Sequence, residues 1–259
     1  MQSLRNIHGI FLDLGGTLLY PPSGSFSFSA LAKQYFTPGK LSKLPEERVR
    51  HAIEQARQAL YAHLPVLTIE DEHPIFLAYY TALSEELGLG LSPAQLAAIT
   101  DDKVYNKTDN SRLFDDTKQT LEALSGKYRL GIISDTWPSV VPLLEHLDIL
   151  KYFDCATYSY ELGTLKPDPK MYQDALTKMG LPAQETLFVD DNPKNLAGAA
   201  ALGIHPVLIC AAPWSPSLDK TFSIDVLQTG GQNAPARESL LSGEPPRIEK
   251  ISELLNLLD

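Results

Sequence analysis

The chain has 259 residues, of which 44% are hydrophobic and 21% charged, so it is long enough and apolar enough to bury a full core. Its formal net charge of −10 argues against a nucleic acid or an anionic membrane surface as the main partner. Only two cysteines occur, no signal-peptide pattern begins the chain and no apolar stretch approaches membrane-spanning length, so we expect a cytoplasmic protein.

An apolar run near the N-terminus, IFLDLGGTLL at residues 10–19, contains a single carboxylate, Asp13. The run predicts a buried strand, and Gly15 and Gly16 predict a tight turn directly after it. Ligands of open α/β sheets bind at the carboxyl ends of the strands. Asp13 is therefore a candidate nucleophile or metal ligand, although this stretch alone is equally consistent with a carboxylate that caps a turn.

The next part of the chain is expected to be helical. Residues 20–25, YPPSGS, are helix and strand breakers that close the first element. Apolar residues at helical spacing predict helices over residues 45–63 and 75–87, and Ser92 followed by Pro93 predicts the start of a third. No β-type run interrupts this part, which we interpret as an all-helical insert.

From residue 114 onward, predicted strands alternate with predicted helices. The strands are expected at 128–134, 156–160, 185–189 and 207–210, and the helices at 116–125, 138–147, 170–179 and 192–202. Such alternation predicts βαβ crossovers and therefore a parallel sheet. The Pro- and Gly-rich residues 211–247 are expected to form a partly ordered excursion with one possible strand at 221–228, and residues 248–258 a terminal helix.

Polar side chains follow three of the predicted strands. Asp13 follows the first, Ser134-Asp135-Thr136 the second and Asp190-Asp191-Asn192 the third, while Lys166 precedes a crossover helix. In a parallel sheet these strand ends lie on the same rim. Carboxylates, a lysine and a hydroxyl suit a divalent metal together with a phosphate group, because Mg²⁺ prefers oxygen ligands and the other two groups bind phosphoryl oxygens.

The order of these motifs resembles the haloacid dehalogenase (HAD) superfamily of hydrolases. The family motif D-x-D-x-T corresponds to D-L-G-G-T at residues 13–17, and Ser134 ends the second motif strand. Lys166 opens K-P-D-P, and Asp190-Asp191 precedes an Ala- and Gly-rich helix. The resemblance implies a Rossmannoid α/β core at residues 1–19 and 112–259, with a helical cap at residues 20–111.

The resemblance also implies roles for individual residues. Asp13 would attack phosphorus to give an aspartyl-phosphate, with Lys166 as the second catalytic group. Mg²⁺ would be held by Asp13, the carbonyl of Gly15, Asp190 and Asp191. The residues implied on the substrate side are Thr17, Gly16, Ser134, Asp135 and Lys166, of which Thr17 would steady the loop. Asp135 stands where Asn is more usual, and either faces the substrate or caps a turn.

The chain departs from the family motif at Gly15. In phosphatases of this family the second Asp of D-x-D is the general acid and base, and glycine has no side chain to replace it. General acid–base help is worth about 100- to 10,000-fold in rate. We therefore expect slow hydrolysis of alkyl phosphates unless another group supplies the proton, and we expect Gly15→Asp to raise that rate.

The main prediction is a Mg²⁺-dependent phosphomonoesterase acting on a small phosphorylated molecule, as a monomer or homodimer. A metal-independent haloacid dehalogenase also lacks the second Asp, but Asp190-Asp191 speaks for a metal. The phosphonate-cleaving branch lacks it too and needs a cap lysine that forms an imine; the sequence marks none of the cap lysines as buried. A non-catalytic binding protein with the same fold is a further alternative.

Overall fold

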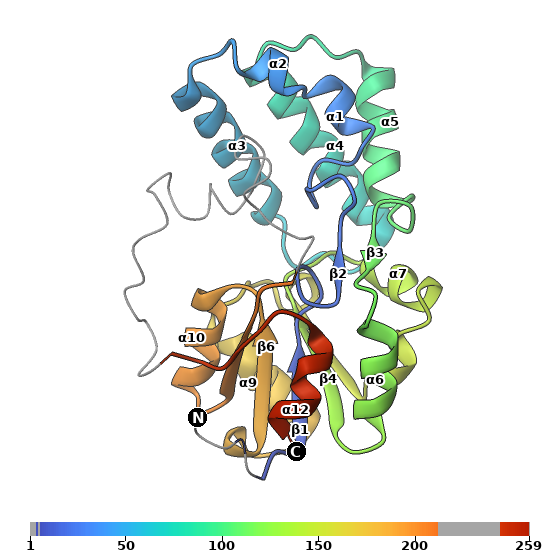
Figure 1. Cartoon of the computed structure of the whole chain (residues 1–259). Helices are drawn as coiled ribbons and strands as arrows, with labels where there is room; N and C mark the ends of the chain where they lie inside the picture. Colours follow the sequence, from blue (N-terminus) through green and yellow to red (C-terminus); the bar gives the residue numbers. More distant parts are fainter. Residues whose placement is uncertain (1–3, 5, 212–243, 259) are drawn as a thin grey trace.

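The protein is described by a computed structural model that covers residues 4, 6–211 and 244–258 (Figure 1). Its larger part is built on a six-stranded sheet in the order β5-β4-β1-β6-β7-β8. Every neighbouring pair in this sheet is parallel. The strands are β1 (Gly9–Leu12), β4 (Arg129–Ser134), β5 (Cys155–Tyr158), β6 (Thr186–Asp190), β7 (His205–Ile209) and β8 (Arg247–Ile248). The predicted parallel α/β sheet is confirmed.

Helices cover both faces of this sheet. Ile10 and Leu12 of β1 are buried in the cluster that includes side chains of α6, α7 and α12, whereas Phe11 is buried in the cluster of α9 and α10. Alternate side chains of a strand point to opposite faces, so one apolar run supplies both clusters. These helices are α6 (Thr117–Ser125), α7 (Val140–His146), α9 (Pro169–Met179), α10 (Pro193–Ala201) and α12 (Leu254–Leu258), with the short α8 (Ser159–Leu162) after β5.

The second part of the molecule is a group of helices above the carboxyl ends of the strands (Figure 1). It consists of α1 (Ala32–Tyr35), α2 (Pro38–Leu41), α3 (Glu46–Tyr61), α4 (Ile69–Glu86) and α5 (Pro93–Val104). These helices have their own hydrophobic cluster, which Trp137 from the sheet-based part also joins. We refer to this group as the cap and to the sheet-based part as the core.

Two short strands connect cap and core. β2 (Leu19–Tyr20) leads into the cap and β3 (Arg112–Leu113) leaves it, and the two pair antiparallel in a ladder of their own. This pairing was not predicted from the sequence, since the prolines after Tyr20 indicated a break. The division of the chain into domains at residues 19 and 112 remains a prediction, close to where these strands lie.

The helix predictions in the cap were partly right. The helix expected at 45–63 is α3, and α5 begins with a capping box in which Ser92 and Gln95 bind each other's backbone. The helix expected at 75–87 begins earlier, at Ile69. Its start is fixed by Thr68, whose side chain accepts a hydrogen bond from the amide of Asp71 at 3.1 Å.

The C-terminal prediction was wrong in its first residues. Instead of continuing a helix from residue 248, Arg247 and Ile248 form β8 and pair with Leu208 and Ile209 of β7. The helix α12 begins only at Leu254. The strand suggested at 221–228 lies outside the described residues. No helix in the part of the chain that the structure describes is both long and apolar enough to cross a membrane.

Candidate active site

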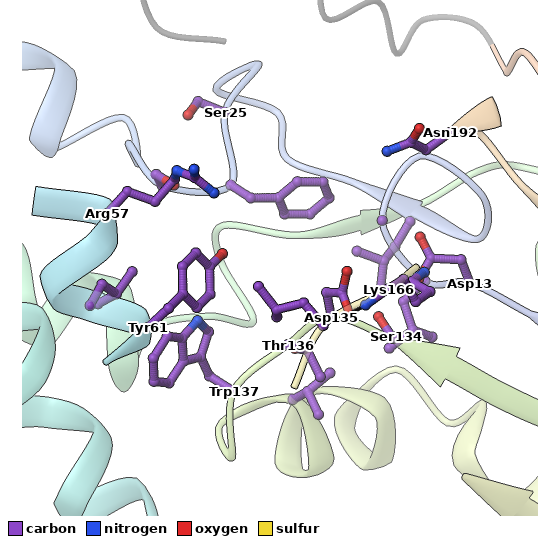
Figure 2. A pocket seen from close by; sticks show the side chains of 18 of the residues that line it. Asp13, Ser25, Arg57, Tyr61, Ser134, Asp135, Thr136, Trp137, Lys166 and Asn192 are labelled. Carbon is purple, nitrogen blue, oxygen red and sulfur yellow. Dashed lines mark hydrogen bonds and ion pairs between the residues drawn. The ribbon is translucent and has the colours of Figure 1, made fainter. Parts of the chain in front are cut away.

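A cavity of about 450 Å³ lies between the carboxyl ends of the core strands and the cap. Figure 2 shows Asp13 and Lys166 toward one end of it and Arg57 and Tyr61 of the cap toward the other. The candidate site residues from the sequence that line the cavity are Asp13, Gly15, Ser134, Asp135, Lys166 and Asp191. The topology thus brings to one place residues that are up to 178 positions apart in the chain, counted from Asp13 to Asp191.

Lys166 lies at the centre of the strand-end cluster, and its side chain is only 1% exposed. Its Nζ lies 2.9 Å from Oδ1 of Asp13 and 2.7 Å from Oδ2 of Asp190, and donates to the carbonyl of Ile133 at 3.1 Å. Burial alone would lower the pKa of this amine, but the surrounding carboxylates outweigh it and hold the pKa well above its usual value. Lys166 is therefore a cation that fixes Asp13 at the strand end.

Asp190 and Asp191 are adjacent but have different surroundings. Asp190 is completely buried, and its Oδ1 accepts from the amide of Asn192 at 2.7 Å. Nδ2 of Asn195 lies within 3.2 Å of both oxygens of Asp190, and Nζ of Lys166 donates a hydrogen bond to Oδ2. Asp191 instead lines the cavity. Asp190 therefore positions Lys166, and Asp191 is the carboxylate of the pair that reaches the cavity.

The turn after β1 is held by its own backbone. The amides of Thr17, Leu18 and Leu19 all donate to the carbonyl of Leu14, and the amide of Gly16 donates to the carbonyl of Leu19. Gly16 has a φ of +75°, which glycine adopts without strain. The buried hydroxyl of Thr17 makes no hydrogen bond among the described residues. The expected steadying role of Thr17 therefore rests on its backbone and not on its hydroxyl.

A side chain at Gly15 is disfavoured for a different reason from one at Gly16, because it would require the ring of Phe26 to move. The φ of Gly15 lies in the ordinary range, but a Cβ added there would lie 2.9 Å from Cε2 and 3.0 Å from Cζ of Phe26. Real Cβ atoms essentially never approach another atom this closely. Phe26, in the segment between β2 and α1, therefore fills the space that the side chain of residue 15 would need. No local pattern around Gly15 or Phe26 predicts this contact.

Ser134 ends β4, Asp135 follows it, and both lie beside Lys166 (Figure 2). Ser134 is 3% exposed and lines the cavity. Oδ1 of Asp135 accepts from the backbone amide of Lys166 at 2.9 Å, so Asp135 both caps this turn and lines the cavity. The carboxyl group of Asp135 is in contact with the cavity, but the protein around it removes much of its hydration, and this raises its pKa to about 7. The positive charge of Lys166 opposes this rise in pKa, and the negative charge of Asp13 adds to it.

The strand-end carboxylates fit a divalent cation. Asp13, Asp190 and Asp191 each offer an oxygen, and these oxygens lie within 4.8 Å of one another. Lys166 supplies one positive charge to the two buried carboxylates of Asp13 and Asp190. Burial raises the pKa of Asp190 to about 6, against the opposing effect of Lys166 and with a further rise from Asp13. A surplus of enclosed negative charge is costly without another cation, and carboxylate oxygens are the ligands that Mg²⁺ prefers.

Two lysines of the cap line the same cavity. The sequence marked none of the cap lysines as buried, yet Lys103 donates from Nζ to the carbonyl of Phe26 at 2.9 Å and lies 5.0 Å from the ring centroid of Phe76. Lys107 follows four residues later. Burial lowers the pKa of Lys103 to about 7, with a further lowering from Lys107. Their four-residue spacing is typical of one helix face, but α5 ends at Val104 and Lys107 lies in the turn after it, so the spacing does not predict that the two amines meet at the cavity.

Comparison with protein families gives a match to the model for haloacid dehalogenase-like hydrolases over residues 7–203. The chain belongs to this family. The resemblance inferred from the motifs is confirmed, as is the conclusion that this HAD-like hydrolase is an enzyme.

Relatives of this HAD-like hydrolase include phosphatases. The phosphoglycolate phosphatase of Escherichia coli strain K12 is 34% identical over 221 residues, which covers 80% of this chain and 82% of the relative. The phosphoglycolate phosphatase of Salmonella typhimurium strain LT2 is 26% identical over 211 residues, with the same coverage of both chains.

Solved structures share the fold. A 2-haloacid dehalogenase from Pseudomonas syringae pv. Tomato DC3000 has a TM-score of 0.59 at 20% identity, covering 97% of this chain and 98% of that chain. The putative HAD-hydrolase YfnB from Bacillus subtilis, bound to magnesium, has a TM-score of 0.64 at 14% identity, covering 98% and 100%. At these identities the likeness establishes the fold alone.

Proposed function

We propose that the protein is a Mg²⁺-dependent phosphomonoesterase in which Asp13 is the nucleophile. The observation that carries this proposal is the position of Asp13. Its carboxylate lies on the cavity wall, 2.9 Å from the buried ammonium of Lys166 and within 4.8 Å of the oxygens of Asp190 and Asp191. A carboxylate held by a cation in an enclosed site meets the requirements of a nucleophile that must approach an anionic phosphate.

The chain's own residues then divide the work. A carboxylate oxygen of Asp13 attacks phosphorus, the ester P–O bond breaks and an aspartyl-phosphate forms, which water hydrolyses in a second step. The hydroxyl of Ser134 hydrogen-bonds a transferring phosphoryl oxygen, and Lys166, whose three donors are directed at Asp13, Asp190 and the carbonyl of Ile133, contributes its positive charge. Mg²⁺ would be held by Asp13, Asp191 and the carbonyl of Gly15, next to the buried carboxylate of Asp190. When bound, the ion neutralises negative charge between carboxylate and phosphate.

Asp135 is our candidate for the acid and base that Gly15 cannot supply. Of the described residues that line the cavity, three carry carboxyl groups: Asp13, Asp135 and Asp191. The first is assigned to attack and the third to the metal, which leaves Asp135. With a pKa of about 7, this group is present in both protonation states near neutral pH, as an acid–base catalyst should be.

The donor set favours this function over two of the alternatives from the sequence. A metal-independent dehalogenase gains nothing from the clustered oxygens of Asp13, Asp190 and Asp191. A non-catalytic binding protein does not need Asp13 held by an ammonium group on the wall of a cavity. The phosphatases among the relatives agree with phosphate ester hydrolysis.

The test is a series of phosphate monoesters graded by the pKa of the leaving alcohol, assayed with and without Mg²⁺. The series should include aryl, acyl and alkyl phosphates, among them phosphoglycolate because of the relatives. We expect phosphate release that stops when the metal is chelated and returns when it is restored. Chloride release from a 2-haloacid in the presence of chelator, with no phosphate release from any ester, would contradict the proposal.

A further inference from the structure

The cap end of the cavity contains two lysine amines that are bound only to uncharged groups. Nζ of Lys103 donates to the carbonyl of Phe26 at 2.9 Å, and Nζ of Lys107 donates to the hydroxyl of Ser139 at 3.0 Å. In the described ranges, no carboxylate oxygen lies within 4.0 Å of either amine. Enclosed charges are normally paired, so two such amines on one cavity wall call for an explanation.

The carboxylate whose charge acts on both amines hydrogen-bonds to uncharged groups. Glu72 of α4 is 0% exposed, and its two oxygens accept from the amide and the hydroxyl of Ser139, both at 2.8 Å. Its charge opposes the lowering of the pKa of Lys103 and of Lys107 but does not cancel it, because burial is the larger effect on each amine. Glu72 therefore offsets at most one of the two positive charges, and the other is left for a bound anion.

The other cation on the cap side does not share this property. Arg57 makes hydrogen bonds with both carboxylate oxygens of Glu54, at 3.0 to 3.2 Å. Its charge is thus already paired within α3. The cavity wall around the two lysines is otherwise largely aromatic, with Phe26, Phe76 and Tyr79 among the lining residues. An apolar wall excludes competing water and strengthens a charge interaction with a bound ligand.

We propose that Lys103 and Lys107 form a subsite for a second anionic group of the substrate. The enzyme would then prefer phosphate monoesters whose alcohol part ends in a carboxylate or in another phosphate. This inference rests on the proposed function, since it takes the phosphoryl group to lie at Asp13. A cavity of about 450 Å³ suits a small metabolite that places its two charged ends at the two ends of the cavity.

The subsite has a characteristic dependence on pH. The charged groups that face Lys103 are Lys107, which lowers the pKa of its amine to about 7 together with burial, and Glu72, which opposes this. A bound anion favours the protonated amine, so binding takes up a proton. Affinity for the second anionic group is therefore complete below pH 7 and falls above it, by at most tenfold per pH unit.

The experiment compares matched esters that differ only in the far end. For alcohol parts of two, three and four carbons, kcat and KM are measured for the hydroxyl-ended, carboxylate-ended and phosphate-ended monoesters. We expect the anionic esters to have a KM about 10- to 100-fold below that of the hydroxyl-ended ester of equal length, as for charge-assisted hydrogen bonds in enclosed sites. The preferred anion distinguishes a carboxylate from a phosphate.

Two variants and a control assign the effect to the lysines. Lys103→Met and Lys107→Met keep most of the aliphatic stem and remove the charge, whereas Lys103→Arg retains it. We expect both Met variants to lose the preference for anionic esters and its pH dependence, measured as the ratio of kcat/KM between the anionic and the hydroxyl-ended ester of equal length. Lys127→Met, at an exposed position outside the cavity, should change neither.

Binding measurements separate this inference from the proposed function. Calorimetric titration of the same esters into Asp13→Asn reports the preference for the far end without turnover. If no ester is hydrolysed but anionic esters bind more tightly in a Lys103-dependent manner, the phosphatase proposal fails and the subsite stands. Equal affinity for esters with anionic and with hydroxyl far ends refutes the subsite. A second refuting result is an adduct between an aldehyde phosphonate and Lys103 that borohydride reduces, because it would assign this amine to imine chemistry.

Discussion

Gly15 is the position where the effect of a substitution follows most directly from the structure. Gly15→Asp introduces a Cβ 2.9 Å from the ring of Phe26, and the backbone itself is in a conformation that any residue adopts. Overpacking of this kind costs about 1–3 kcal/mol. For a chain of this size each kcal/mol lowers the melting temperature by about 2–4 °C. We therefore expect the single variant to melt lower and to gain no activity, contrary to the expectation from the motif alone.

Removing the ring should reverse this result. In the double variant Gly15→Asp/Phe26→Ala, the new carboxyl group occupies the space that the ring has left. The double variant should therefore melt at the same temperature as Phe26→Ala alone. The decisive background is Asp135→Asn, in which the native candidate acid is removed but the acceptor for the amide of Lys166 is kept. There the double change should raise kcat/KM for alkyl phosphates by about 100-fold or more.

Melting temperatures and alkyl phosphate kinetics of the full set of variants provide the assay. The matched control is Gly15→Ala, alone and with Phe26→Ala, because it has the same Cβ without the carboxyl group. A Gly15→Asp protein that melts like the wild type would refute the steric argument. A triple variant with Asp135→Asn that regains no more activity than its Ala counterpart would refute the argument about the missing acid.

Three further predictions concern the core residues. Asp13→Asn should abolish phosphate release while shifting the melting temperature by only a few degrees, and persisting turnover would remove Asp13 as the nucleophile. Asp135→Asn should slow alkyl phosphates about 100-fold but aryl phosphates little, because phenolate leaves without a proton; an equal loss on both would limit Asp135 to positioning Lys166. Asp191→Asn should raise the Mg²⁺ concentration for half-maximal activity at least tenfold, measured by titration after chelation, and an unchanged requirement would contradict metal binding by Asp191.

The central part of the core sheet was predictable because β1, β4 and β6 each carry a local signal. Apolar runs predict buried strands that end at Asp13, Ser134 and Asp190. The parallel topology then places the carboxyl ends of these strands together. Asp168 caps α9 by accepting from the amide of Lys170 at 2.8 Å, and an Asp directly before a Pro at the start of a helix is a local signal of such a cap. These features depend on neighbours in sequence or on one rule of topology.

The features that the sequence did not reveal depend on distant parts of the chain. Phe26 lies in a segment without periodicity, and only the folded cap places its ring against Gly15. Lys103 and Lys107 have helical spacing that is equally typical of a solvated face. The pairing of Ile248 with β7 depends on a partner 39 residues earlier, Ile209, across a segment that has no readable pattern. In each case the decisive contact is tertiary.

The paired linker strands have a consequence for how this architecture tolerates change. Because Leu19 lies opposite Leu113 and Tyr20 opposite Arg112, the chain leaves the core and re-enters it at the same point. Everything between these pairs is topologically an insertion into one closed hairpin, and insertions whose ends lie close together are the ones that domains accept most readily. A short reverse turn joining Tyr20 to Arg112 would therefore give a miniature of the enzyme that keeps Asp13 and Lys166 and loses Lys103. Such a capless chain would show what the core does with any phosphate ester that reaches it.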